Sequence, residues 1–208
     1  MYESGLCFIF AYFAGTLSPA ALIAALKKKN LRACGTGNLG ATNVSLALGK
    51  FYGFIVMLFD IAKAYLSVKI AKLIFPQLAV AGLLAGLGAV AGHIFPFYMR
   101  FHGGKGLAPF GGAILAYDPG LFAILLAIGI VMILITDYPI ALTFSAVSIA
   151  PFAAALRGEE PAKLCLLLGT SALVLFKHIE NITRIKEGSE MKLSHYLHRS
   201  RDTAIEDQ

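Results

Sequence analysis

The sequence predicts an all-α integral membrane protein of about seven transmembrane helices, and three observations support this fold class. Hydrophobic residues make up 58% of the 208 residues, charged residues make up 14%, and the mean hydropathy is +0.74. A soluble domain usually carries about 25% charged residues, so lipid must cover much of this apolar surface. The other two observations are the division of the chain into apolar runs and the placement of basic residues between them.

The apolar runs cover residues 5–26, 51–75, 78–98, 105–117, 120–136, 139–156 and 162–177. About 20 helical residues cross the roughly 30 Å hydrocarbon layer of a bilayer. The fourth and fifth runs are short and meet at Asp118-Pro119-Gly120, so six spans with one broken helix are the alternative to seven. We expect one domain over residues 1–208, with residues 185–208 as a polar cytoplasmic tail.

The basic residues favour seven spans and set the orientation. Glu3 precedes the first run and Lys27-Lys28-Lys29 follows it, which predicts an N-terminus outside the cell and a cytoplasmic first loop. Seven spans then place residues 27–50, 99–104, 137–138 and 178–208 in the cytoplasm, together with most of the basic loop residues. Arg157 is the clear basic residue of the outside loops. Six spans would put the basic tail, with Arg199 and Arg201, outside.

A glycine-rich polar loop lies between the first two long runs. It reads Gly35-Thr36-Gly37-Asn38-Leu39-Gly40-Ala41-Thr42-Asn43. Glycines let backbone N–H groups approach a ligand, and free N–H groups at a helix start bind phosphate or another anion. The glycine spacing also fits a dinucleotide-binding fingerprint, but that fingerprint requires a preceding parallel strand, and here a lysine run precedes it. We therefore predict anion binding, with a polar turn and helix cap as the alternative.

A second polar cluster brackets the start of the fourth run. It reads Gly92-His93-Ile94-Phe95-Pro96 and then Phe101-His102-Gly103-Gly104-Lys105-Gly106. Three glycines around one lysine suit a phosphate, because the amides form an anion-binding nest and the ammonium adds a point charge. His93 fits a packing role as well as a catalytic one. Asp60 and Lys63, inside the second run, are expected to form a structural ion pair.

A third polar cluster stands where the last run ends. It reads Lys177-His178-Ile179-Glu180-Asn181-Ile182-Thr183-Arg184. His178 and Asn181 share a helix face and are placed to orient a hydroxyl, whereas the plain alternative is an ordinary polar helix end. The chain has no H-x-x-x-x-D pair, no G-x-S-x-G elbow and no spaced set of metal ligands, and Cys7, Cys34 and Cys165 are expected to be free thiols. A chemistry without metal or covalent nucleophile is favoured.

These three clusters, in this order, resemble the acyl-phosphate-dependent glycerol-3-phosphate acyltransferases, the PlsY family. The resemblance covers nearly the whole chain. It implies a bacterial inner-membrane enzyme with seven spans and an active site that faces the cytoplasm. Such an enzyme moves a fatty acyl chain from acyl phosphate to the 1-hydroxyl of glycerol 3-phosphate and so makes lysophosphatidic acid for phospholipid biosynthesis.

The resemblance also assigns site residues. The catalytic residues it implies are Lys105, His178 and Asn181. The substrate-binding residues it implies are Thr36, Gly37, Asn38, Gly40, Ala41, Thr42, Asn43, Gly103, Gly104, Thr143 and Glu180. The first glycine loop would hold the acyl phosphate, and Lys105 would hold the acceptor phosphate. We expect no metal or other cofactor, no nucleic-acid partner, membrane lipid as the surroundings, and a monomer.

The chain departs from the family pattern at several positions. Leu46 stands where the family usually has arginine, Thr36 replaces a serine, and Lys177 replaces another arginine. An arginine binds phosphate through two parallel N–H bonds, which a lysine does not replace. The alternatives are therefore a divergent paralogue with a different acceptor, or a non-catalytic phosphate-binding, lipid-binding or transport membrane protein.

Overall fold

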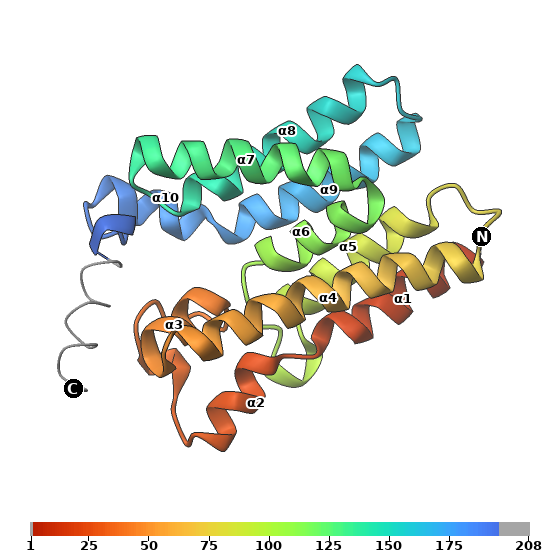
Figure 1. Ribbon diagram of the computed structural model, residues 1–208. Helices are drawn as coiled ribbons and strands as arrows, with labels where there is room; N and C mark the ends of the chain where they lie inside the picture. The colour runs from red at the N-terminus through yellow and green to blue at the C-terminus, as the bar shows by residue number, and fades with distance from the viewer. Residues whose placement is uncertain (1, 196–208) are drawn as a thin grey trace.

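The computed structural model describes residues 2–195, and within them it contains helices and no strands (Figure 1). The helices are α1 (Tyr2–Thr16), α2 (Pro19–Leu26), α3 (Ala41–Leu48), α4 (Lys50–Ile74), α5 (Ala81–Ile94), α6 (Leu107–Tyr117), α7 (Pro119–Thr136), α8 (Ile140–Leu156), α9 (Pro161–Lys177) and α10 (Ile179–Lys186). Short 3₁₀ turns cover Leu31–Ala33 and Phe97–Met99. Arg199 and Arg201, in the predicted cytoplasmic tail, lie outside the described residues.

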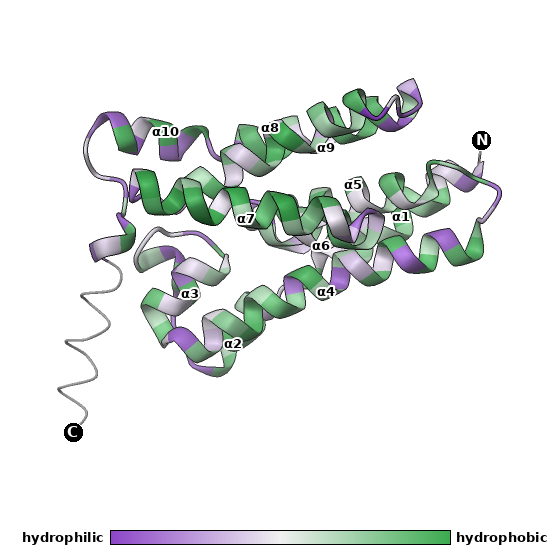
Figure 2. Ribbon diagram, turned by 45° about the horizontal axis from the view of Figure 1, so that its top comes forward, coloured by the Kyte–Doolittle hydropathy of each residue, from purple (hydrophilic) through white to green (hydrophobic). Residues whose placement is uncertain are grey.

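Local capping explains two breaks between these helices. Ser18 separates α1 from α2, because its Oγ accepts a hydrogen bond from the amide of Ala21 at 3.2 Å and Pro19 begins the next helix. Asp118 ends α6 and caps α7, where its Oδ1 accepts from the amide of Leu121 at 2.9 Å. Figures 1 and 2 show α7 running back alongside α6. The fourth and fifth apolar runs therefore form two antiparallel helices and not one broken helix.

Part of the predicted membrane architecture is visible in helix length and composition. Three helical stretches are long and apolar enough to cross a bilayer, namely Tyr2–Leu26, Ala81–Met99 and Pro119–Thr136. A fourth is α9 taken together with α10, which bend by 43° at their junction. The helices α6 and α8 are apolar but shorter, and α4 is long but carries several charged residues. The count of seven spans and the orientation stay predictions.

Glycines allow the closest helix contacts. Gly88 and Gly92 of α5 lie against the backbone of α1, and a Cβ at either position would overlap a carbonyl oxygen there. Gly112 of α6 meets the backbone of α4 at Ile61 in the same way. Small residues at such contacts let helix backbones pack tightly in a membrane. Gly88 and Gly92 therefore serve helix packing between α5 and α1.

The loops gather at two opposite ends of the bundle (Figure 1). The glycine-loop end contains residues 27–43, 97–106, 137–138 and 178–195, where Asp137 accepts hydrogen bonds from Ser194. The far end contains the N-terminus and residues 75–80, 117–120 and 157–160, where Glu3 accepts a hydrogen bond from Gln77 at 3.0 Å. Figure 2 shows hydrophobic residues dominating α7 between these ends. Successive segments thus alternate between the ends, as the predicted topology requires.

Candidate active site

The glycine loop is folded around the side chain of Asn43. This residue is 1% exposed, and its Oδ1 accepts from the amide of Thr36 at 2.8 Å. Its Nδ2 donates to the carbonyls of Leu31 and Asn38, both at 2.8 Å. These bonds use the acceptor and both donors of the amide group. The resemblance placed Asn43 among the substrate-binding residues, whereas the structure shows it shaping the loop from within.

The loop leads directly into the start of α3. Gly37 has a φ of +69°, a left-handed conformation that side chains disfavour. Gly40 precedes α3 without a side-chain cap, so the first amides of the helix, at Ala41 and Thr42, have no partner inside the helix. A helix start of this kind attracts an anion through its N–H groups and its dipole. The side chains of Thr36 and Thr42 are exposed beside it.

Leu46 lies against this same loop. A Cβ on Gly35 would stand 3.5 Å from Cδ1 of Leu46, and the leucine is half-buried. The position at which the resemblance led us to expect an arginine therefore faces the glycine loop in this fold. An apolar side chain here offers the loop no charge and no hydrogen-bond donor.

The loop before α6 is pinned to the end of α5. The amide of Gly103 donates to the carbonyl of Ile94 at 2.9 Å, and the amide of Gly104 donates to the carbonyl of His93 at 3.1 Å. A Cβ on either glycine would overlap atoms of His93. The expected phosphate nest of free amides is thus not formed at these two residues, because α5 takes up both N–H groups and requires both glycines for close packing.

One arginine ties the two loops together. Nη2 of Arg32, just before the glycine loop, donates to the carbonyl of His102 at 2.6 Å. Met99 also packs against the apolar cluster beneath the glycine loop, which contains Leu31 and Leu39. The loop of the first motif and the loop of the second are therefore neighbours, although 70 residues separate Arg32 from His102 in the chain.

Lys105 reaches from this loop to the third motif. Its Nζ donates to Oδ1 of Asn181 and lies 3.9 Å from Oε2 of Glu180, whose side chain is largely exposed. The lysine side chain itself is only 14% exposed. Burial, followed by the positive charge of Arg184, lowers the pKa of Lys105 to about 8. At neutral pH the lysine is still a cation, with one neutral hydrogen-bond partner and one distant carboxylate.

Asn181 is held in turn by Glu190. Nδ2 of Asn181 donates to Oε1 of Glu190 at 2.7 Å, and Oε2 of the same carboxylate accepts from Nε of Arg184 at 2.7 Å. This arrangement fixes the amide so that its oxygen faces Lys105. Glu190 carries no signal in the sequence, because it lies in a polar segment of mixed charge where no spacing marks a single carboxylate.

His178 stands at the bend between α9 and α10, buried beside Thr143 of α8. Its Nδ1 lies 2.8 Å from the carbonyl of Val174, an acceptor, so this nitrogen carries the proton. In the neutral ring Nε2 then keeps its lone pair, and Nε2 lies 3.5 Å from Oγ1 of Thr143. The structure therefore brings together Thr143 of α8, His178 at the bend between α9 and α10, Asn181 of α10 and Lys105 of the loop before α6.

An apolar groove of about 520 Å³ opens between α7 and α8. Ile185 of α10 stands at its edge, and the buried Thr143 is not one of its lining residues. Its lining residues are Ile128, Met132, Thr136, Tyr138, Ile140, Ala141, Phe144, Ser145, Ser148, Ile149 and Ile185. The groove is almost entirely apolar, which suits a hydrocarbon chain and not a sugar or nucleotide.

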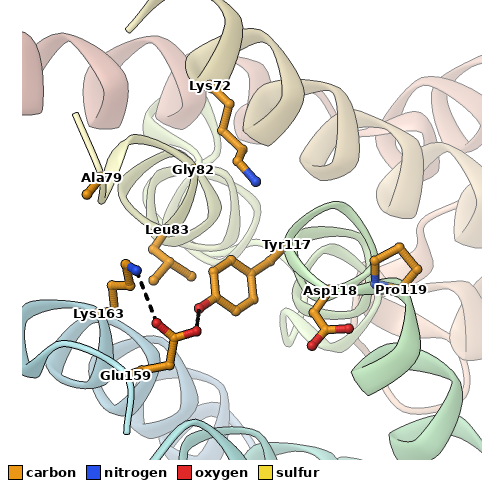
Figure 3. A pocket seen from close by; sticks show the side chains of 9 residues that line it. All are labelled: Lys72, Ala79, Gly82, Leu83, Tyr117, Asp118, Pro119, Glu159 and Lys163. Carbon is orange, nitrogen blue, oxygen red and sulfur yellow. Dashed lines mark hydrogen bonds and ion pairs between the residues drawn. The ribbon is translucent and has the colours of Figure 1, made fainter. Parts of the chain in front are cut away.

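A second cavity, of about 380 Å³, lies at the far end of the bundle (Figure 3). Its polar groups bind one another: Glu159 accepts from Tyr117 at 2.8 Å and from Lys163 at 3.1 Å, as Figure 3 shows. Asp118 at its rim pairs with Arg157. None of the site residues expected from the sequence lines this cavity, so we do not take it as the active site.

Comparison with known proteins gives a family match over most of the chain. The family described as glycerol-3-phosphate acyltransferase matches residues 5–188. The chain belongs to this family. A glycerol-3-phosphate acyltransferase of Macrococcus caseolyticus is 34% identical over 195 residues, which cover 92% of this chain and 97% of the relative. The corresponding protein of Aquifex aeolicus is 36% identical over 185 residues, covering 88% of this chain and 95% of the relative.

Solved structures of the family match as well. The integral membrane glycerol 3-phosphate acyltransferase PlsY in its glycerol 3-phosphate form superposes with a TM-score of 0.85 at 33% identity, covering 91% of this chain and 94% of that one. Its lysophosphatidic acid form gives a TM-score of 0.82 at 32% identity, with the same shares covered. The acyltransferase interpretation of the three motifs is confirmed at the level of the family, and the transport and binding alternatives are not favoured.

Proposed function

We propose that this protein transfers a fatty acyl chain from acyl phosphate to the 1-hydroxyl of glycerol 3-phosphate, at the cytoplasmic face of a bacterial inner membrane. The observation that carries the proposal is the meeting of Lys105, Asn181, His178 and Thr143 at the end of the bundle that also holds the glycine loop. These residues come from distant parts of the chain, and together they offer an anion site, a cation and a hydroxyl-orienting pair.

Each substrate group has a matching protein group in this arrangement. The start of α3 and the glycine loop bind the phosphate of the donor through backbone amides. Lys105 binds the phosphate of the acceptor, since it is a cation in a mostly buried position whose ion pair with Glu180 is long, at 3.9 Å. The apolar groove between α7 and α8 takes the acyl chain, because its lining is almost entirely apolar and includes Ile185, which follows Asn181 on α10.

The reaction needs positioning more than a protein nucleophile. The acceptor hydroxyl oxygen attacks the acyl carbon, the bond from that carbon to the phosphate oxygen breaks, and inorganic phosphate leaves with the electron pair. Asn181 and Thr143 orient the hydroxyl. Two groups are candidates for its proton: Nε2 of His178, which keeps a lone pair, and a phosphate oxygen of a substrate. Holding two anionic reactants together accounts for much of the catalysis.

The proposal is tested with the purified full chain in detergent or in nanodiscs. Labelled glycerol 3-phosphate is supplied with palmitoyl phosphate, palmitoyl-CoA or palmitoyl-acyl carrier protein, and glycerol and dihydroxyacetone phosphate serve as rival acceptors. We expect lysophosphatidic acid from palmitoyl phosphate and glycerol 3-phosphate alone. Equal use of a thioester donor would refute the donor assignment, and faster use of a rival acceptor would refute the acceptor assignment.

The orientation is tested by single-cysteine labelling in intact cells. Cys7, Cys34 and Cys165 are first replaced by serine, and one cysteine is then introduced at position 28 or 157. We expect an impermeant maleimide to label position 157 and to reach position 28 only after the membrane is permeabilised, since the charge bias places Lys28 inside. Labelling of position 28 in intact cells would invert the topology.

A further inference from the structure

Three buried ionisable side chains lie between α4 and α5, and the proposed reaction uses none of them. Nζ of Lys63 lies 2.7 Å from Oδ1 of Asp60 and donates to the carbonyl of Leu17 at 2.7 Å. Nδ1 of His93 lies 3.2 Å from Nζ of Lys63 and 3.3 Å from Oδ1 of Asp60. All three side chains are less than 10% exposed.

The ion pair alone does not explain the histidine. Charges inside a membrane bundle are costly unless they are paired, and Asp60 and Lys63 already pair with each other while Lys63 also binds the break between α1 and α2. An imidazole adds no net charge to this balance when it is neutral. What it adds is a rigid ring whose Nδ1 edge is held by the pair and whose opposite edge points elsewhere.

That opposite edge lies under the loop that carries Lys105. A Cβ on Gly104 would overlap Nε2 of His93 and would stand 2.7 Å from Cε1 and 3.1 Å from Cδ2. The three atoms nearest to this Cβ position all belong to the imidazole. Gly104 has no left-handed φ that would require glycine. The ring of His93 is therefore the reason why residue 104 must be a glycine.

We propose that His93 is a positioning residue for Lys105: the Asp60–Lys63 pair holds one edge of the imidazole, and the other edge supports the Gly103–Gly104 backbone so that the next residue, Lys105, reaches Asn181. The inference rests on the proposed role of Lys105 in holding the acceptor phosphate. In this role His93 does not touch the substrate. It fixes the distance between the Gly103–Gly104 backbone and the end of α5.

The test is a double-mutant cycle between positions 93 and 104, read as separate kcat and KM values for each substrate. His93→Ala is expected to raise the KM for glycerol 3-phosphate on the order of 10- to 100-fold, since a displacement of about 1 Å has effects of that size. The KM for acyl phosphate should stay within about twofold, because the proposed donor site lies at the start of α3 and the ring of His93 lies against Gly104. Gly104→Ala should produce a similar defect in the parent protein, and little further defect when it is combined with His93→Ala.

Gly103→Ala is the matched control. Its Cβ would overlap the backbone carbonyl of residue 93 and approach Cδ of Pro96 at 2.6 Å, and neither contact depends on the imidazole. It should therefore be harmful both in the parent protein and in combination with His93→Ala. If Gly104→Ala is as harmful with alanine at position 93 as with histidine, the ring does not support the loop and the inference is wrong.

A second variant keeps the test valid if His93→Ala does not fold. His93→Asn retains an amide that faces Asp60 and Lys63 but lacks the far edge of the ring, and we expect the same selective rise in the KM for glycerol 3-phosphate. A uniform loss of kcat that parallels the amount of folded protein, with both KM values unchanged, would mean a merely structural role and would overturn the inference.

Lys105→Ala, measured in parallel, separates the positioning role of His93 from the phosphate-binding role of Lys105. A raised acceptor KM in Lys105→Ala with an unchanged acceptor KM in both His93 variants would overturn the role of His93 and leave the proposed function standing. An unchanged acceptor KM in Lys105→Ala itself would overturn the phosphate-binding role of Lys105, and with it the positioning role of His93.

Discussion

The two ends of the bundle both gather lysines, carboxylates and glycines, yet they differ in how their charges are balanced. At the far end, Glu159 pairs with Lys163 and Asp118 pairs with Arg157, and both ion pairs are partly exposed to solvent. At the glycine-loop end, Arg184 pairs closely with Glu190, but Lys105 is largely buried and its Nζ lies 3.9 Å from the carboxylate of Glu180. An ion pair that is already closed needs no ligand, whereas a buried cation without a close carboxylate gains from binding an anion.

The two ends also differ in how crowded their glycines are. Gly37 and Gly158 have nearly the same φ, +69° and +68°. Gly158 has open space around its Cβ position, whereas Gly37 faces the carbonyl of Arg32 at 3.2 Å inside the glycine loop. A shared backbone conformation thus serves a simple turn at one end and, at the other, a more crowded loop for which we propose anion binding.

The largest effect is expected from Gly37→Leu compared with Gly158→Leu. Both substitutions force a leucine into the left-handed region, at a cost of about 1–2 kcal/mol each. Only the first blocks the approach of a phosphate to the loop amides. Acyl transfer should fall below detection in Gly37→Leu and stay within about twofold of the parent in Gly158→Leu, when rates are normalised to folded protein by size-exclusion chromatography. Equal activities would show that the loop is an ordinary turn.

Lys105→Ala compared with Lys163→Ala tests the difference in charge balance directly. Removing a preorganised cation from the reaction site should lower kcat/KM for glycerol 3-phosphate by about 10²- to 10³-fold. Removing Lys163 breaks a partly exposed ion pair with Glu159, which is worth about 0–1 kcal/mol, and should leave kcat/KM unchanged. A similar loss in both variants would mean that general destabilisation, and not acceptor binding, explains the first result.

The pH dependence of acceptor binding should report the lowered pKa of Lys105. The ammonium is protonated below its pKa of about 8 and loses its charge as the pH rises through that value. The KM for glycerol 3-phosphate should therefore be flat up to about pH 7.5 and rise by about tenfold per pH unit well above pH 8. Lys105→Arg keeps its charge throughout this range, so its KM should stay flat. A flat profile in the parent protein would place the acceptor phosphate elsewhere.

The helix breaks and the meeting of the three motifs could be predicted from the sequence. Apolar runs bounded by Ser18-Pro19 or Asp118-Pro119 predict helices and their breaks, because caps and prolines act within a few residues. The meeting of the three motifs follows from their predicted placement on one side of the membrane. Membership of a known family adds the expected roles of Lys105 and His178.

The details that the sequence did not predict depend on contacts between distant residues. Gly103 and Gly104 resemble a phosphate nest in sequence, but the end of α5 takes up their amides. Asn43 resembles a ligand, but its hydrogen bonds close its own loop. Glu190 gives no local signal, because its role appears only once the chain folds back onto Asn181. In each case the partner of a polar group, and not its residue type, decides what it does.

The smallest predicted effect concerns Leu46, where the glycine-loop end itself lacks a charge that its family usually has. Leu46 lies against Gly35 and is half-buried, so a longer side chain from this position would pass along the glycine loop. Leu46→Arg should lower the KM for glycerol 3-phosphate about three- to tenfold, since a guanidinium forms paired, charge-assisted hydrogen bonds with a phosphate. Leu46→Met is the matched control for side-chain length without charge and should leave the KM unchanged. The measurement is the rate of acyl transfer to several acceptors by the parent protein and by Leu46→Arg. The prediction is wrong if Leu46→Arg uses glycerol 3-phosphate less well and the parent uses a bulkier or non-phosphorylated acceptor efficiently. Leu46 would then shape the site for a different acceptor.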